Sequence, residues 1–272
     1  MRLFLLWFPA SEESIFVFSQ VIGILRNPSY RYAKNCIQTG MKIQLNPLVA
    51  FRGYGVNFAS VAPITAFQVG ATSAFYKTLF NPKEGQAPTP FQTAISALCA
   101  GFLSGSLSGP SESIILQQQQ TGKGAGATYR DMVARAGVKG LFRGTQFAMA
   151  REAIYTAGYM ALGPTCIDQA RDMGLSDFTA RLAGGIVAGV TAAVVSHPCD
   201  TLKTFYQNDF EGKQLPNLKA AINHGNLFKG LLPRMTRLTI GTVIIANTND
   251  VLTRGYMKHF PKENDNVNKM AL

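Results

Sequence analysis

Long stretches of apolar residues alternate with shorter polar ones along this chain, and they predict helices. Residues 178–195 are apolar and rich in Gly and Ala, and residues 55–79 carry no charge before Lys77. Residues 91–119, 146–167 and 233–257 form three further long segments, and residues 1–20 a shorter one. Since about twenty residues take a helix across a bilayer, the pattern predicts an all-α membrane protein with six transmembrane helices.

The composition favours a membrane protein over a soluble one. Charged residues make up 15% of the chain, against about 25% in soluble domains, and hydrophobic residues make up 47%. Among the 26 glycines, pairs such as Gly101 and Gly105 stand four residues apart, a spacing that lets membrane helices approach closely. The net charge of +11 is accompanied by no nucleic-acid motif, so we expect no nucleic-acid partner.

The residues that most often carry covalent or metal chemistry are not grouped for it. The four cysteines form no CxxC pair, and the three histidines are scattered. Ser196, His197 and Asp200 are the residue types of a hydrolase triad, but such close neighbours at one helix end do not supply its geometry. We therefore expect that the protein is not an enzyme, and that it holds no metal ion and no cofactor apart from bound lipid.

A motif recurs near the ends of three apolar segments. It consists of a proline placed to kink the helix, an acid two residues later and a glutamine nine residues after the proline. The copies are Pro198, Asp200 and Gln207; Pro110, Glu112 and Gln119; and a weaker Ser11, Glu13 and Gln20.

A second marker follows each copy, and it joins an aromatic residue, a base and a glycine. The three copies are Phe51-Arg52-Gly53, Phe142-Arg143-Gly144 and Phe228-Lys229-Gly230. The glutamines at 20, 119 and 207 are 99 and 88 residues apart, and the glycines at 53, 144 and 230 are 91 and 86 apart. Two markers that share one period indicate a triplicated chain.

The three-fold repetition of both markers in a chain of 272 residues resembles the mitochondrial carrier family. The resemblance implies six transmembrane helices in three pseudo-repeats around a central cavity, with short helices on the matrix side. We place the repeats at residues 1–80, 91–170 and 176–260, followed by a polar tail at 261–272. Residues 30–36 resemble the short matrix helix of the first repeat. The resemblance also implies a multi-pass monomer of the mitochondrial inner membrane.

The charges of the loops predict the orientation. Six spans put both termini on one side, and the loops around residues 21–50, 120–143 and 203–229 lie on the other side. These loops carry a large excess of Lys and Arg over Asp and Glu. Such an excess marks the side that is not translocated, which is the matrix if the membrane is the mitochondrial inner one.

The first repeat departs from the pattern. If Ser11 marks the kink, ten residues precede it, and as a helix they span roughly 15 Å, about half a bilayer core. Either the first helix is truncated, by biology or by a wrong gene start, or the first repeat is built differently.

The resemblance implies a matrix gate in which the acid of one repeat pairs with a base of the next. The acids are Glu13, Glu112 and Asp200, and the bases are expected at Phe16, Ile115 and Lys203. Since two of these three positions are apolar, we expect only the pair between Glu112 and Lys203, and hence a weakened gate. The glutamines at 20, 119 and 207 are expected to brace it.

Counting seven residues from each marker glycine predicts a substrate site. The count reaches Ser60, Arg151 and Arg237, and Glu152 is adjacent to Arg151. Family members bind substrate at these levels. Guanidinium groups bind carboxylate or phosphate bidentately, and Glu152 would take an amine, which favours an amino acid or another amine-bearing carboxylate. The alternative is that Arg151 and Glu152 only pair with each other or with neighbouring residues. Arg234 is expected near the lipid headgroups.

The aromatic-base-glycine markers open helices whose free N–H groups suit an anionic headgroup. In the family these places bind cardiolipin, and simple capping by glycine is the alternative. The residues are Arg52, Gly53, Arg143, Gly144, Lys229 and Gly230.

The predicted function is exchange or import of a small polar solute by alternating access. The missing gate charges leave open a non-transporting membrane adaptor or receptor on the same fold, or an inactive carrier with an incomplete first repeat. The sequence leaves open the substrate, the counter-substrate and any coupling to protons.

Overall fold

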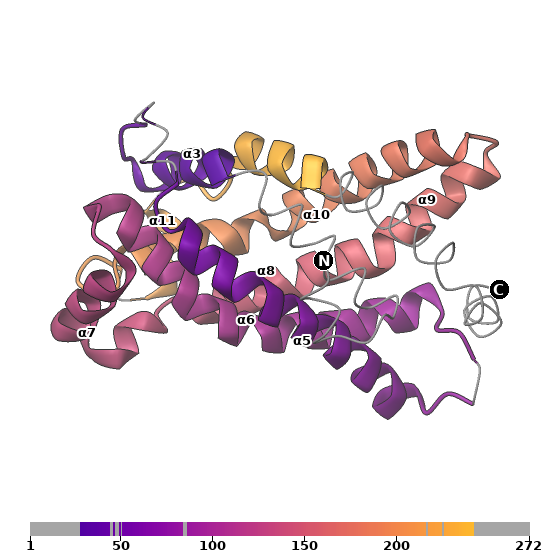
Figure 1. The fold of residues 1–272 in the computed structure, drawn as a ribbon, viewed down its shortest axis with the longest axis horizontal. Helices are drawn as coiled ribbons and strands as arrows, with labels where there is room; N and C mark the ends of the chain where they lie inside the picture. Colours follow the sequence, from indigo (N-terminus) through magenta and orange to yellow (C-terminus); the bar gives the residue numbers. More distant parts are fainter. Residues whose placement is uncertain are drawn as a thin grey trace, which may run out of the picture.

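A computed structural model describes residues 28–241 except 44–45, 47–48, 50, 84–85, 216 and 225. Within these residues the secondary structure is helical, as expected, and no strand occurs (Figure 1). The helices are α3 (Pro28–Thr39), α5 (Tyr54–Phe80), α6 (Pro90–Thr121), α7 (Ala125–Leu141), α8 (Thr145–Ala157), the π-helical turn η1 (Gly158–Leu162), α9 (Gly163–Asp172), α10 (Asp177–Asn208) and α11 (Leu218–Asn223). Residues 231–241 are also helical.

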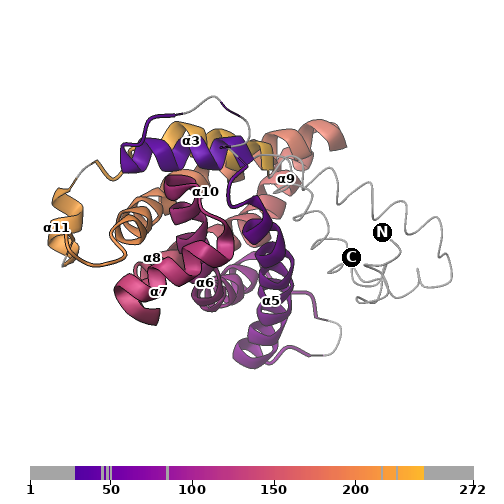
Figure 2. The ribbon, with the colours of Figure 1, turned by 60° about the vertical axis from the view of Figure 1, so that its left-hand side comes forward.

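The long helices form a bundle along the long axis of the molecule (Figures 1 and 2). Helix α6 contacts both α5 and α8, and α10 contacts both α8 and α9. Helices α3, α7 and α11 gather at one end, on the left of Figure 1. Pro110 and Pro198 both lie inside helices, in α6 and α10. The connections that the charge pattern assigned to the matrix therefore share one end of the bundle.

The bundle carries polar side chains inside and apolar ones outside. Gln68, Ser104 and Arg151 are buried. The exposed large apolar side chains include Phe58, Phe67, Phe102, Leu103, Leu107, Ile186, Val187 and Val195. Among the described helices, α5 and α10 are long and apolar enough to cross a membrane. This distribution suits a bundle whose surface meets lipid, because lipid requires backbone groups to be satisfied internally but accepts apolar side chains.

Glycine brings α6 and α8 into backbone contact. A Cβ atom added at Gly105 would lie 2.3 Å from Cα of Met149, and one at Gly101 would lie 2.6 Å from the carbonyl oxygen of Glu152. Both distances are far below van der Waals contact. The small-residue spacing of the sequence therefore has a packing role on this face of α6.

The three marker glycines occupy equivalent places. Gly53, Gly144 and Gly230 have φ angles of 82°, 79° and 81°, which L side chains rarely adopt. A Cβ at Gly53 would lie 2.8 Å from Ile115, and one at Gly144 would lie 3.1 Å from the Lys203 carbonyl oxygen. At Gly230 the corresponding carbonyl is that of Lys34, at 3.5 Å. Each marker glycine thus packs on the helix of the next repeat in the cycle.

This geometry corrects the register of the first repeat. Lys34, Ile115 and Lys203 are equivalent by their contacts with the marker glycines, whereas we expected Phe16 to take the place that Lys34 holds. Each is followed four residues later by a glutamine, at 38, 119 and 207. Residues 30–36 are therefore not a peripheral matrix helix but the equivalent of the segments around Ile115 and Lys203. Ser11, Glu13, Phe16 and Gln20 lie outside the described residues.

In the corrected register, the first repeat differs from the other two in the length of the connection between its motif glutamine and its marker glycine. Fifteen residues separate Gln38 from Gly53, against twenty-five from Gln119 to Gly144 and twenty-three from Gln207 to Gly230. The longer connections contain α7 and α11. The expectation of a shortened first helix depended on a kink at Ser11, and this register no longer supports it.

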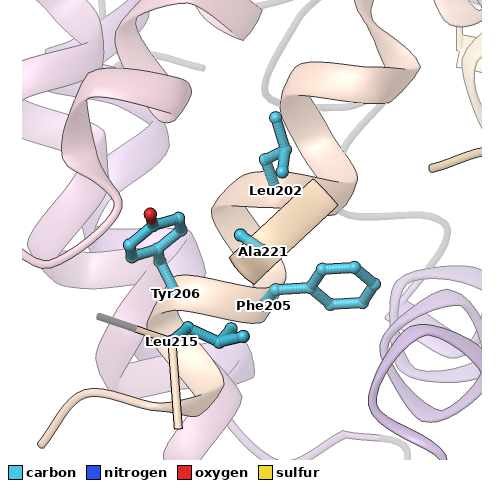
Figure 3. Close-up of a cluster of buried hydrophobic side chains, with 5 residues drawn as sticks. All are labelled: Leu202, Phe205, Tyr206, Leu215 and Ala221. Atoms are coloured by element: carbon cyan, nitrogen blue, oxygen red, sulfur yellow. The ribbon is translucent and has the colours of Figure 1, made fainter. Parts of the chain in front are cut away.

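The α11 end of the bundle is held by an apolar cluster. Leu202, Phe205 and Tyr206 on α10 pack with Leu215 and Ala221, and Figure 3 shows them around the end of the helix. Burying such side chains contributes about 1.5–3 kcal/mol each. The cluster anchors the segment of α10 that carries Asp200 and Lys203.

Candidate functional site

A cavity of about 780 Å³ lies among the helices, including the part that is open to solvent. It contains all four predicted substrate residues: Ser60, Arg151, Glu152 and Arg237. The other polar residues of its lining are Arg31, Asn57, Thr65, Gln68, Ser108, Ser111, Glu112, Tyr155, Tyr159 and Arg234. The residues found by counting from the marker glycines therefore line the same cavity.

Glu112 lines the cavity and is shared by three cations. Its carboxylate lies 3.1 Å from Lys203 Nζ, 3.1 Å from Arg151 Nη1 and 3.2 Å from Arg31 Nη2. Glu112 and Lys203 are both buried. The pair between Glu112 and Lys203 that the sequence predicts is present.

Asp200 holds a second group of cations. Its carboxylate lies 2.9 Å from Lys34 Nζ and 2.9 Å from Arg234 Nη1. Arg151 and Lys203 follow at 3.6 Å each. Two of these partners were not expected: Lys34, because the register was misplaced, and Arg234, which was assigned to the headgroups but is buried. Ion pairs of Asp200 with Lys34, of Glu112 with Lys203 and of Glu112 with Arg31 thus link α3, α6 and α10.

The third equivalent position of this charged layer holds no acid and base that could pair with each other. By the corrected register Arg31 takes the place that Glu112 and Asp200 hold in the other repeats, and Ile115 takes the place of Lys34 and Lys203. Arg31 donates to Asn57 Oδ1 at 2.5 Å and reaches across to Glu112. The expectation of an apolar residue at 115 holds, but the first repeat contributes a cation where an acid was expected.

Amide side chains add a layer of hydrogen bonds below the charges. Asn35 donates to Gln119 Oε1 at 2.7 Å, Gln38 donates to Thr201 Oγ1 at 3.0 Å, and Gln207 donates to the carbonyl oxygen of Gly109 at 3.1 Å. These bonds join α3 to α6, α3 to α10 and α10 to α6. Gln119 and Gln207 therefore bridge repeats, and Gln38, which the sequence analysis missed, does the same. The spacing of four between Lys34 and Gln38 was the available signal.

The other cavity residues differ in how fully they are engaged. Arg151 forms an ion pair with Glu152, and Glu152 also accepts a hydrogen bond from Gln68 at 3.2 Å. The Ser60 hydroxyl donates to the carbonyl oxygen of Asn57. For Arg237 the described residues provide no ion pair and no hydrogen bond. Arg151 and Glu152 thus pair with each other and with neighbouring residues, whereas Arg237 has no such partner in the described part of the chain.

The marker bases have local partners. Arg143 lies 3.3 Å from Asp209 and 5.1 Å from the centre of the Tyr206 ring. The backbone carbonyl of Lys229 lies 3.2 Å from His197 Nε2. Arg52 lies beside Gly122, the residue that ends α6. These contacts fix the helix starts, and lipid binding there stays a prediction.

Comparison with known proteins matches two segments of the chain, which correspond to the predicted second and third repeats. Residues 86–171 and 175–260, together more than half of the chain, match the family description "Mitochondrial carrier protein". The chain is 27% identical to mitochondrial substrate carrier family protein X of Dictyostelium discoideum, over 79% of this chain and 75% of the relative. It is 28% identical to the putative mitochondrial transporter UCP3 of Canis lupus familiaris, over 88% and 82%. It is 26% identical to mitochondrial glutamate carrier 1 of Bos taurus, over 58% and 59%.

Proposed function

Because the chain belongs to the mitochondrial carrier family, with its six-helix membrane fold, we propose that it moves a small carboxylate-bearing solute across the mitochondrial inner membrane by alternating access. The observation that carries this proposal is one cavity in which Ser60, Arg151 and Arg237 converge from three repeats. A guanidinium group at mid-span is costly and marks a functional site. The cavity ends at the charged layer around Glu112 and Asp200.

Arg151 supplies a link between the solute and the gate. It lines the cavity, yet its Nη1 lies 3.1 Å from Glu112 and 3.6 Å from Asp200. A carboxylate bound in the cavity competes for the same guanidinium. The bound solute therefore weakens the hold of Arg151 on the two gate acids, and the gate opens more readily when the site is occupied.

The amine-bearing class depends on Glu152. This carboxylate is engaged by Arg151 and Gln68 and takes an amine only if it leaves them. One relative is named a glutamate carrier, which is consistent with a carboxylate-bearing substrate. Exchange and import are both compatible with the site. Cardiolipin at the marker glycines and a monomeric state complete the proposal.

Uptake into proteoliposomes tests the proposed function. Full-length protein is reconstituted with cardiolipin, and the uptake of labelled carboxylates and amino acids is measured. We expect Arg151→Ala and Arg237→Ala to reduce uptake by about tenfold or more, since each removes a charge-assisted contact. Arg130→Ala, at an exposed position on α7, is the control and should retain uptake.

A second candidate is a non-transporting member of the family. It is favoured by the gate position where Arg31 and Ile115 replace an acid and a base. Folded protein that binds solute but transports none of the solutes would establish this candidate instead.

A further inference from the structure

The cavity and the gate carry more positive than negative charge. A second hollow continues from the cavity toward the gate, and Arg31, Arg151 and Arg237 line both. The charged residues that line the two hollows include three carboxylates: Glu112, Glu152 and Asp200. They also include six cations: Arg31, Lys34, Arg151, Lys203, Arg234 and Arg237. Within the described part of the chain, three positive charges are thus left over.

Two of the three extra charges lie at Arg31 and Arg237, and the third lies at Asp200, which two cations contact closely. Lys34 and Arg234 lie against Asp200, Lys203 lies against Glu112, and Arg151 lies against Glu152. Arg31 has only a share of Glu112, which two other cations also contact. Arg237 has no carboxylate partner among the described residues. Both guanidinium groups line the same two hollows.

Such an excess is expensive inside a membrane protein. Removing a guanidinium group from water costs several kcal/mol unless an opposite charge compensates it. Arg31 stands where the other two repeats have an acid, so the same substitution both removes a negative charge and adds a positive one. A ligand anion would restore the balance.

We propose that Arg31 and Arg237 form an anion subsite, and that the transported solute carries at least two negative charges. This inference rests on the proposed function and narrows it. The solute is a small dicarboxylate or a small phosphate-bearing acid. One of its anionic groups faces Arg31 and Arg237, and the other faces Arg151. A zwitterionic amino acid has no net charge and leaves the excess uncompensated, and a monocarboxylate offsets only part of it.

Ligand-induced thermal stabilisation of the full chain tests the inference separately from transport. The probes are succinate, phosphoenolpyruvate, glutamate, alanine and lactate, each added to protein in cardiolipin-containing detergent. Succinate or phosphoenolpyruvate should raise the melting temperature most, and the comparison of the two distinguishes a dicarboxylate from a phosphate source. Arg31→Gln and Arg237→Gln should each weaken that binding by about tenfold or more.

Matched variants separate charge from structure. Arg31→Lys keeps the charge and should keep most of the binding, and Arg130→Gln on the exposed face of α7 should keep all of it. Equal stabilisation by alanine and succinate, or unchanged succinate binding in Arg31→Gln, overturns the inference. If uptake of alanine or glutamate persists in that case, the proposed carrier function stands without it. Binding of succinate with no uptake supports the subsite and overturns the carrier function.

Discussion

At the scale of single residues, the acids and the bases of this gate are not equivalent. Glu112 is the only carboxylate that contacts Arg31 in the described part of the chain, and it also contacts Lys203 and Arg151. A buried ion pair adds little net stability over an apolar pair, but removing one partner leaves the other charge uncompensated. Losing one of these acids therefore deprives more charges of a partner than losing one of the bases.

Glu112→Gln should destabilise the protein strongly. The change leaves three cations without this partner and should lower the free energy of unfolding by about 3–5 kcal/mol, the usual effect of breaking a buried pair. The measurement is thermal unfolding of the purified protein. Asp168→Asn, at an exposed position near Arg171, is the control, and it should change stability by about 0.5 kcal/mol or less. Equal melting temperatures for the two variants would contradict the shared-acid arrangement.

At the scale of elements, the closest contact is between α6 and α8. Gly101 and Gly105 face backbone atoms of α8 at distances where a methyl group has no room. Gly70 on α5 is also helical but has open space around its Cα. Gly105 and Gly70 are therefore both helical, but Gly105 faces the backbone of α8 and Gly70 faces open space.

Gly105→Ala should separate α6 from α8, and Gly70→Ala should not move any helix. Overpacking of this kind typically costs about 1–3 kcal/mol, so the melting temperature of Gly105→Ala should fall clearly. That of Gly70→Ala should stay unchanged or rise slightly, because alanine favours the helix. Similar falls in both variants would show that α6 and α8 are not in backbone contact.

The elements also show where sequence reasoning worked and where it failed. Residues 110–119 and 198–207 keep the proline, the acid and the glutamine, so the amino-acid sequence was sufficient to place these two copies of the motif. In the first repeat the acid position is Arg31, and only Lys34 and Gln38 keep their types. The stretch from Ser11 to Gln20 has an acid and a glutamine at the spacing of the motif, so the first copy was predicted there and not at residues 29–38. Contacts of Gly230 with α3, which no local pattern reveals, settled the register.

At the scale of the whole molecule, two of the three equivalent positions of the charged layer carry an acid and a base, and the third carries arginine and isoleucine. The pairs of Glu112 with Lys203 and of Asp200 with Lys34 link successive repeats. By the same symmetry Arg31 should meet the residue at 115, and Ile115 offers it no charge. The sequence predicted residues that line one cavity, but the sharing of charges among the helices depends on distances that only the assembled bundle sets.

Arg31→Glu combined with Ile115→Lys should complete the ring. Each single change places a charge without its intended partner, whereas the double variant provides an acid and a base at equivalent places. A double-mutant cycle on thermal stability should therefore give a favourable coupling of about 0.5–3 kcal/mol. Arg130→Glu combined with Ile115→Lys is the control and should show none. Strict additivity of the first pair would mean that the two positions do not meet.

The sharing of Glu112 and Asp200 also bears on how such a chain changes over generations. Each carboxylate is contacted by three or four cations, so the loss of one base leaves the acid still engaged. Redundancy of this kind should let the charged layer tolerate the loss of one base better than the loss of Glu112 or Asp200. The layer already holds arginine and isoleucine at its third acid–base position, while Glu112 and Asp200 keep their cations.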